Sequence, residues 1–172
     1  MEESIKNEQC LDDSIIMDSK EDTVLDFIEQ IKRQFQLKQA EAVSYSPLVL
    51  AYLGDCVYEM VLRTVIVCHG NTSVNQLNKK TSYFAKATTQ SQIIKHLMNE
   101  LTEEEMRIFK RGRNAKSVTI AKHASMTEYR MATGLEALVG YLYLNGQYER
   151  LVALIKSGIQ HLEDAQDKER LL

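Results

Sequence analysis

Residues 50–62 read LAYLGDCVYEMVL, and this stretch decides how the fold is interpreted. The run is long and apolar enough to form a buried helix, yet Asp55 lies at its centre and Glu59 follows one turn later. A carboxylate removed from water without a partner costs several kcal/mol. Either another part of the protein compensates these two acids, or they bind something.

The sequence around this stretch predicts an all-α protein. The chain of 172 residues has one proline and seven glycines, which leaves few strand-ending turns, and its apolar residues recur at helical spacing. Ser46-Pro47 predicts a helix start, with serine as N-cap and proline at the first helical position. The Thr-x-x-Glu pattern of residues 102–105 predicts a capping box. The helices expected in the main domain are 46–69, 73–84, 88–99, 103–111, 127–145 and 147–165, with a loop over 112–125.

Charge divides the chain into an acidic beginning and a mildly basic remainder. Residues 1–29 hold ten acids against two lysines, whereas the rest holds 14 acids and 19 lysines and arginines. The acidic, aperiodic start predicts a disordered tail. The expected domains are an acidic tail over 1–20, an amphipathic helical extension and linker over 21–44, a helical domain over 45–165 and a C-terminal tail over 166–172.

Other features indicate a cytoplasmic protein that does not enter the membrane. No apolar run reaches the roughly 18 residues of a membrane span, and the N-terminus lacks the layout of a signal peptide. The three cysteines form no Cys-x-x-Cys pair, which favours reduced thiols over a disulfide framework or a zinc site.

Two predicted helices each carry an acid on an otherwise apolar surface. On the 46–69 helix, which is expected to be buried nearly all round, a narrow polar seam contains Asp55 and Glu59. On the 127–145 helix the acid is Glu136. A glycine accompanies each helix's acid, Gly54 in the first and Gly140 in the second, and leaves room beside it.

Compensation within a helix is available to only one of these acids. Arg63 is four residues after Glu59, in the favourable order for a helical ion pair, whereas Asp55 and Glu136 have no basic residue three or four positions away. If the latter two face each other, a divalent cation would relieve their repulsion, and oxygen ligands favour magnesium or manganese over zinc. Long-range pairing with an arginine of the basic segment described next is an equally physical alternative.

Residues 107–123, RIFKRGRNAKSVTIAKH, contain six basic residues and no acid. Small residues within the segment would let backbone amides approach a phosphate, and such segments make salt-sensitive contacts with little base specificity. The alternative is a solvated charged surface. The candidate phosphate-binding residues are Lys110, Arg111, Arg113, Asn114 and Lys116.

Together these segments resemble a known family. LAYLGDCVYE is similar to the signature helix of ribonuclease III catalytic domains, and GLEALVGYLYL is similar to their second metal-binding helix. KRGRNAKS followed by EYRMATGLEALVGYLYL resembles, more narrowly, Mini-ribonuclease III, the bacterial form without a double-stranded-RNA-binding domain. The resemblance covers about residues 45–160.

The resemblance implies the helical ribonuclease III endonuclease fold, working as a homodimer, with residues 45–165 as the catalytic domain. It implies magnesium-dependent cleavage of double-stranded RNA, with Mn²⁺ able to substitute for Mg²⁺. The implied substrate is precursor 23S ribosomal RNA, with ribosomal proteins as further candidate partners. Carried over to this chain, Asp55 and Glu136 are the catalytic metal ligands, and the Lys110–Lys116 segment grips the RNA backbone.

The chain also departs from the larger enzymes of that family. Ala51 and Thr133 occupy positions where those enzymes carry a glutamate and an aspartate, and Ser125 occupies another place where an acid is expected. The ligand set therefore stays open to water, Glu59 or Glu128, with Glu59 and Thr133 as candidates to support the ligands from behind. The other hypotheses are a non-catalytic RNA-binding or ribosome-assembly protein and a plain helical interaction module.

Overall fold

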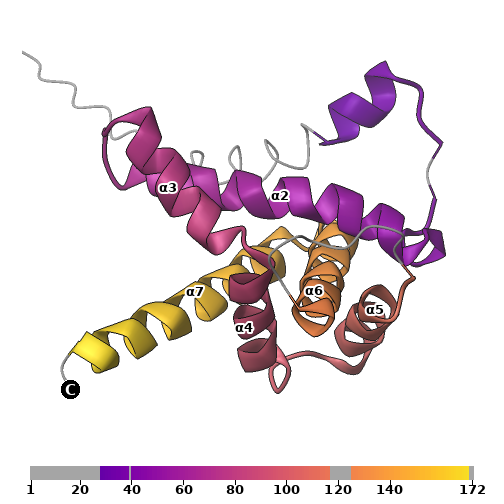
Figure 1. The fold of residues 1–172 in the computed structure, drawn as a ribbon. Coiled ribbons are helices and arrows are strands. Elements are labelled where there is room, and N and C mark those ends of the chain that lie inside the picture. The colour runs from indigo at the N-terminus through magenta and orange to yellow at the C-terminus, as the bar shows by residue number, and fades with distance from the viewer. Residues whose placement is uncertain (1–27, 39, 117–124, 171–172) are drawn as a thin grey trace, which may run out of the picture. The chain divides into compact units, whose positions relative to one another are not determined.

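The computed structural model describes residues 28–38, 40–116 and 125–170 (Figure 1). In the last of these ranges the side chains are described as far as Asp164. The chain divides into two units, residues 1–40 and 41–172, and in the first unit residues 28–34 are helical. No strand occurs among the described residues, in agreement with the predicted all-α class. The elements of the second unit are the 3₁₀ helix η1 (Ala42–Ser44) and the helices α2 (Pro47–Cys68), α3 (Val74–Phe84), α4 (Ala87–Leu97), α5 (Glu103–Arg113), α6 (Met126–Leu144) and α7 (Tyr148–Arg170).

Local capping explains why most helices begin where the sequence predicts. The Ser46 hydroxyl accepts a hydrogen bond from the Val49 amide at 3.3 Å at the start of α2. Thr102 and Glu105 form the expected reciprocal capping box at the start of α5. The predicted disordered tail, residues 1–20, lies outside the described residues, as do residues 117–124 of the basic segment.

Two helices end later than predicted. Helix α5 continues to Arg113 instead of 111, so the first part of the expected 112–125 loop is helical. Helix α7 continues to Arg170, where the sequence predicted an end near 165. Between Glu163 and Arg170 the chain contains neither glycine nor proline, so nothing in the backbone forces an earlier end.

Helix α6 lies at the centre of the second unit, and α2, α4, α5 and α7 all pack against it (Figure 1). Its residues from Met131 to Leu142 are buried with the single exception of Glu136, which is partly exposed. This confirms the prediction that Glu136 is an acid on an otherwise apolar part of the helix. The core around α6 contains the fully buried side chains of Tyr58, Phe109 and several leucines and isoleucines.

Helix α2 differs from the prediction of burial nearly all round. One side is buried, with Leu50, Val57, Tyr58 and Leu62 in the core, but other apolar side chains are exposed. The exposed apolar residues of α2 are Leu48, Val49, Tyr52, Met60, Val65 and Val67, with Tyr52 84% exposed. An apolar helix sequence does not fix how much of the helix the rest of the same chain covers, which is why the prediction of burial nearly all round was wrong. No helix in the described part of the chain is both long and apolar enough to span a bilayer.

Candidate active site

Helices α2 and α6 cross with their backbones in direct contact, and this crossing positions the site. A Cβ atom added to Gly54 would overlap the carbonyl oxygen of Glu136, and one added to Gly140 would overlap the carbonyl oxygen of Leu50. Only glycine fits at both places. The glycines were predicted to leave room beside the acids, but the backbone of the neighbouring helix occupies that space. The close contact brings Asp55 of α2 and Glu136 of α6 to the same crossing.

Asp55 and Glu136 form a carboxylate pair whose members differ in burial. Burial raises the pKa of Glu136 to about 7; the charge of Asp55 adds to this effect, and a hydrogen bond from the Gln90 side chain opposes it. Asp55 is exposed, but partial burial and then the nearby Glu59 raise the pKa of its carboxyl group above the usual value. Both carboxyl groups thus lie in an environment that disfavours their negative charge.

No described cation neutralises the carboxylate pair. The ion pairs among the described residues join other acids, and the predicted pair of Glu59 with Arg63 is among them, at 2.7 Å. The sequence-based alternative, an arginine from the basic segment paired with Asp55 or Glu136, finds no support in residues 107–116. Two oxygen ligands of like charge without a described counterion form a donor set that suits a hard divalent cation.

The positions that depart from the larger enzymes have structural roles. Ala51 is buried, and the Thr133 hydroxyl donates to the Tyr129 carbonyl of its own helix at 3.0 Å. Ser125 is the N-cap of α6 and forms a capping box with Glu128, whose carboxylate accepts from the Ser125 amide and hydroxyl at 2.9 and 2.7 Å. Within the described residues, no three His, Cys, Asp or Glu side chains gather into a metal site. The carboxylate pair has no third acidic ligand there.

The structure adds one residue that the sequence did not indicate. Gln90, on α4, is 1% exposed, and its side chain is hydrogen-bonded to the Glu136 carboxylate. Tyr58, which is fully buried, lies close enough for the charge of Glu136 to contribute to raising its pKa, although burial is the larger cause; its hydroxyl donates to the Phe84 carbonyl at 3.1 Å. Three helices thus surround the largely buried carboxylate.

The described part of the basic segment lies on α5 and its C-terminal cap. Lys110, Asn114 and Lys116 are exposed, while Arg113 is partly exposed, with its guanidinium 5.7 Å from the centre of the Phe109 ring. Arg111 donates to the backbone carbonyls of Val43 and Tyr45 at 3.0 and 3.1 Å. A surface pocket of about 510 Å³ is lined by Glu103, Met106, Arg107, Lys110, Arg111 and Asn114.

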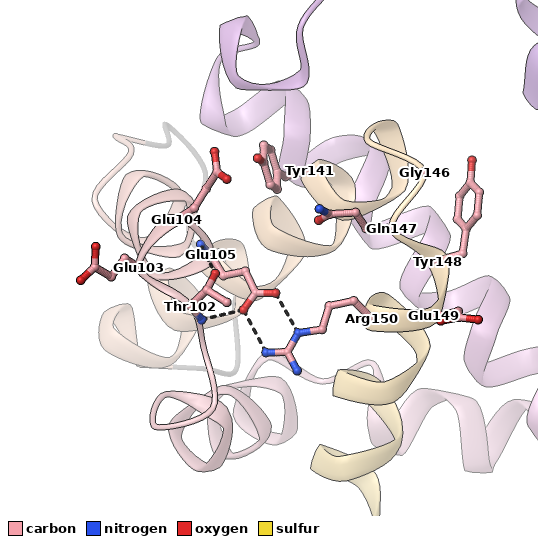
Figure 2. Close-up of a pocket in the computed structure, with 10 residues that line it drawn as sticks. All are labelled: Thr102, Glu103, Glu104, Glu105, Tyr141, Gly146, Gln147, Tyr148, Glu149 and Arg150. Carbon is pink, nitrogen blue, oxygen red and sulfur yellow. Dashed lines mark hydrogen bonds and ion pairs between the residues drawn. The ribbon is translucent and has the colours of Figure 1, made fainter.

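A second pocket, of about 750 Å³, lies apart from the carboxylate pair (Figure 2). It is lined by the start of α5, the end of α6 and the start of α7. Figure 2 shows the Glu105 carboxylate and the Arg150 guanidinium pointing toward each other, with Nε–Oε1 and Nη2–Oε2 distances of 2.8 and 3.0 Å. Because this pair also meets the capping box of α5, it ties α5 to α7. Neither Asp55 nor Glu136 lines this pocket.

Comparison with known proteins agrees with the geometry. Residues 48–147 match the model of the Ribonuclease III domain. The chain is 50% identical over 125 residues to a Mini-ribonuclease 3 of Clostridium tetani, an alignment that covers 72% of this chain and 83% of the relative. It is 42% identical over 144 residues to a Mini-ribonuclease 3 of a Thermoanaerobacter species, covering 84% and 99%. A crystal structure of a Fusobacterium nucleatum protein superposes with a TM-score of 0.65 at 34% identity, covering 72% of this chain and 98% of that one.

Proposed function

Since the chain belongs to the Ribonuclease III domain family and, within it, to the Mini-ribonuclease 3 group, it is an endoribonuclease, and we propose that it cuts double-stranded RNA at the carboxylate pair in a magnesium-dependent reaction. The observation that carries this proposal is the meeting of Asp55 and Glu136 at the glycine crossing, without a described counterion. We further propose precursor 23S ribosomal RNA as the substrate, the cytoplasm as the location and ribosomal proteins as candidate partners.

The two carboxylates fit a magnesium site in which they differ in role. Glu136 is buried against α2 and α4 and would hold the ion from the protein side, whereas exposed Asp55 would hold it from the side that the RNA approaches. When bound, magnesium supplies positive charge that stabilises the phosphate being cleaved and lowers the pKa of a bound water. Water and the RNA phosphate would supply the remaining oxygen ligands, because Ala51 and Thr133 offer no carboxylate.

The exposed basic residues at the end of α5 support a role in gripping the RNA backbone. Lys110, Arg113, Asn114 and Lys116 offer donors to phosphate oxygens, and the pocket along α5 lies beside two of them. Arg111 is the exception in the proposed set, because its guanidinium already binds the backbone of the segment before α2. We assign it the role of fixing α5, with its remaining donor capacity available to RNA.

We propose that the exposed apolar surface of α2 is the homodimer interface. Tyr52, Met60 and Val67 share one side of the helix and are each at least 53% exposed, which is costly for a free helix surface in water. A second copy of the chain would cover them. Because Tyr52 is on the turn that precedes Asp55, such a dimer would place the partner close to the site.

The metal proposal is tested with a base-paired RNA incubated with magnesium or with chelator. The wild-type chain is expected to cut only with magnesium, and Asp55→Asn and Glu136→Gln are expected to lose nearly all cleavage. Glu59→Gln is the matched control, because Glu59 is an acid of the same helix that is already paired with Arg63. Cleavage that survives chelation, or full activity in either of the first two variants, would contradict the proposal, and RNA binding without cleavage would identify a binding protein.

The RNA-binding role is tested separately through the salt dependence of binding. Arg113→Ala is expected to weaken binding of double-stranded RNA and to reduce the slope of log affinity against log salt by about 1. Lys156→Ala, which removes an exposed lysine of α7, is the control and should leave the slope unchanged. An unchanged slope in Arg113→Ala would argue against a phosphate contact at that residue.

A further inference from the structure

Gln90 is an unusual residue to find next to a buried carboxylate. Its side chain is almost completely buried and hydrogen-bonded to Glu136, yet its Oε1 atom has no hydrogen-bond partner in the described structure. A buried carbonyl oxygen without a partner destabilises the folded state. An apolar residue of similar size would avoid that cost, so the amide must supply something that an apolar side chain does not.

What the amide supplies is a neutral hydrogen-bond donor aimed at Glu136. A lysine or arginine at this place would neutralise the carboxylate and repel a divalent cation, and an acid would add repulsion. An amide N–H stabilises the carboxylate anion without a formal charge. It also engages part of the carboxylate on the protein side, which limits the orientations that the group can adopt.

The surroundings of Glu136 give this restraint particular weight. The crossing residues beside it, Gly54 and Gly140, have no side chains that could hold the carboxylate in place. Ala51, on the neighbouring turn of α2, has no polar group either. The hydrogen bond from α4 therefore supplies an orientation that the two crossing helices do not.

We propose that Gln90 is a positioning residue that orients Glu136 for a divalent cation through its side-chain amide. This inference rests on the proposed function, in which Asp55 and Glu136 hold the cation. It assigns a role in the site to α4, a helix that carries neither member of the carboxylate pair.

The test measures cation binding by the full-length chain directly, without RNA and without turnover. Mn²⁺ is titrated into the protein, and free Mn²⁺ is counted by electron paramagnetic resonance. Gln90→Met keeps the length of the side chain but removes the donor, and is expected to weaken Mn²⁺ binding about 10- to 100-fold, as loss of an outer hydrogen bond to a metal ligand does. Gln90→Asn, which draws the amide back from Glu136 by one methylene, should show the same direction of change and covers the case in which Gln90→Met does not fold.

Ser91→Ala is the matched control. Ser91 is the next residue of α4, is equally buried and also has a side-chain oxygen without a described partner, but Glu136 has no described bond to it. This variant should bind Mn²⁺ like the wild type. Wild-type affinity in a folded Gln90→Met or Gln90→Asn, or an equal loss in Ser91→Ala, would overturn the inference.

A fourth variant separates this inference from the proposed function. Glu136→Gln should abolish Mn²⁺ binding if the carboxylate pair is the metal site. If it does so while the Gln90 variants bind normally, the metal site stands and only the role of Gln90 is wrong. If Glu136→Gln binds Mn²⁺ like the wild type, the proposed metal site itself fails and the role of Gln90 fails with it.

Discussion

The buried carboxyl group of Glu136 should make the metal-free protein less stable as the pH rises. Burial, with help from Asp55, raises the pKa of Glu136 from 4.5 to about 7. Because the folded chain holds this proton more tightly than the unfolded chain, the stabilising contribution is complete below about pH 4.5 and is lost as the pH rises through about 7. A difference of about 2.5 pKa units corresponds to about 3 kcal/mol. Glu136→Gln, which cannot ionise, should escape this loss.

The assay is urea unfolding of the full chain in chelator, at one protein concentration, from about pH 5 to about pH 8. The free energy of unfolding of Glu136→Gln, relative to the wild type, should rise by up to about 3 kcal/mol across that range. Glu163→Gln, an exposed glutamate of α7, is the control and should follow the wild type. A difference that stays constant with pH, or a variant less stable than the wild type near pH 8, would refute the reasoning. If Asp55 and Glu136 hold magnesium as proposed, added magnesium should stabilise the wild type at high pH and leave Glu136→Gln unchanged.

Three further changes probe the crossing, the link between α5 and α7, and the exposed surface of α2. Gly54→Ala forces a Cβ into the backbone of α6 and should destabilise the fold by about 3 kcal/mol or more in urea unfolding, whereas Cys56→Ala, at an exposed site on the same helix, should be nearly neutral. Glu105→Gln weakens the pair with Arg150 and should lower the free energy of unfolding by about 1–3 kcal/mol at neutral pH. Because hydrogen bonding to Arg150 lowers the pKa of Glu105, this cost should shrink as acid protonates the wild-type carboxylate. A cost that persists in acid would contradict the assigned role of the pair. Tyr52→Arg places a charge in the proposed dimer interface and should yield monomers in sedimentation experiments; a wild-type mass would count against that interface.

Local signals predicted the helices well because each start is encoded within a few residues. Ser46-Pro47 and the Thr102–Glu105 box both cap helices as expected. The same reasoning could have found the start of α6, since Ser125 and Glu128 have the Ser-x-x-Glu spacing of a capping box. Ser125 lacks the acid that the family resemblance led us to expect there, and in the structure this serine caps the start of α6.

The site was predictable only in part, because its parts are distant in sequence. Asp55 and Glu136 could be singled out because a lone acid in an apolar helix is conspicuous. Gln90 could not, because a glutamine in a polar stretch is ordinary until the fold places it against Glu136. The exposed fraction of α2 was mispredicted for a different reason. An apolar helix favours burial, but its sequence does not determine how much of it the same chain covers.

The glycine crossing means that the separation of the two acids is set by main-chain contact between α2 and α6. Substitutions elsewhere in the core can rearrange side chains, including the orientation of a carboxylate, but they cannot change the distance between the two helix backbones that carry the acids without separating main chains that already touch. Single substitutions elsewhere in the core should therefore leave the distance between the two helix backbones unchanged. The same contact makes the site sensitive to single substitutions at Gly54 or Gly140, because any larger residue there would force the two helices apart.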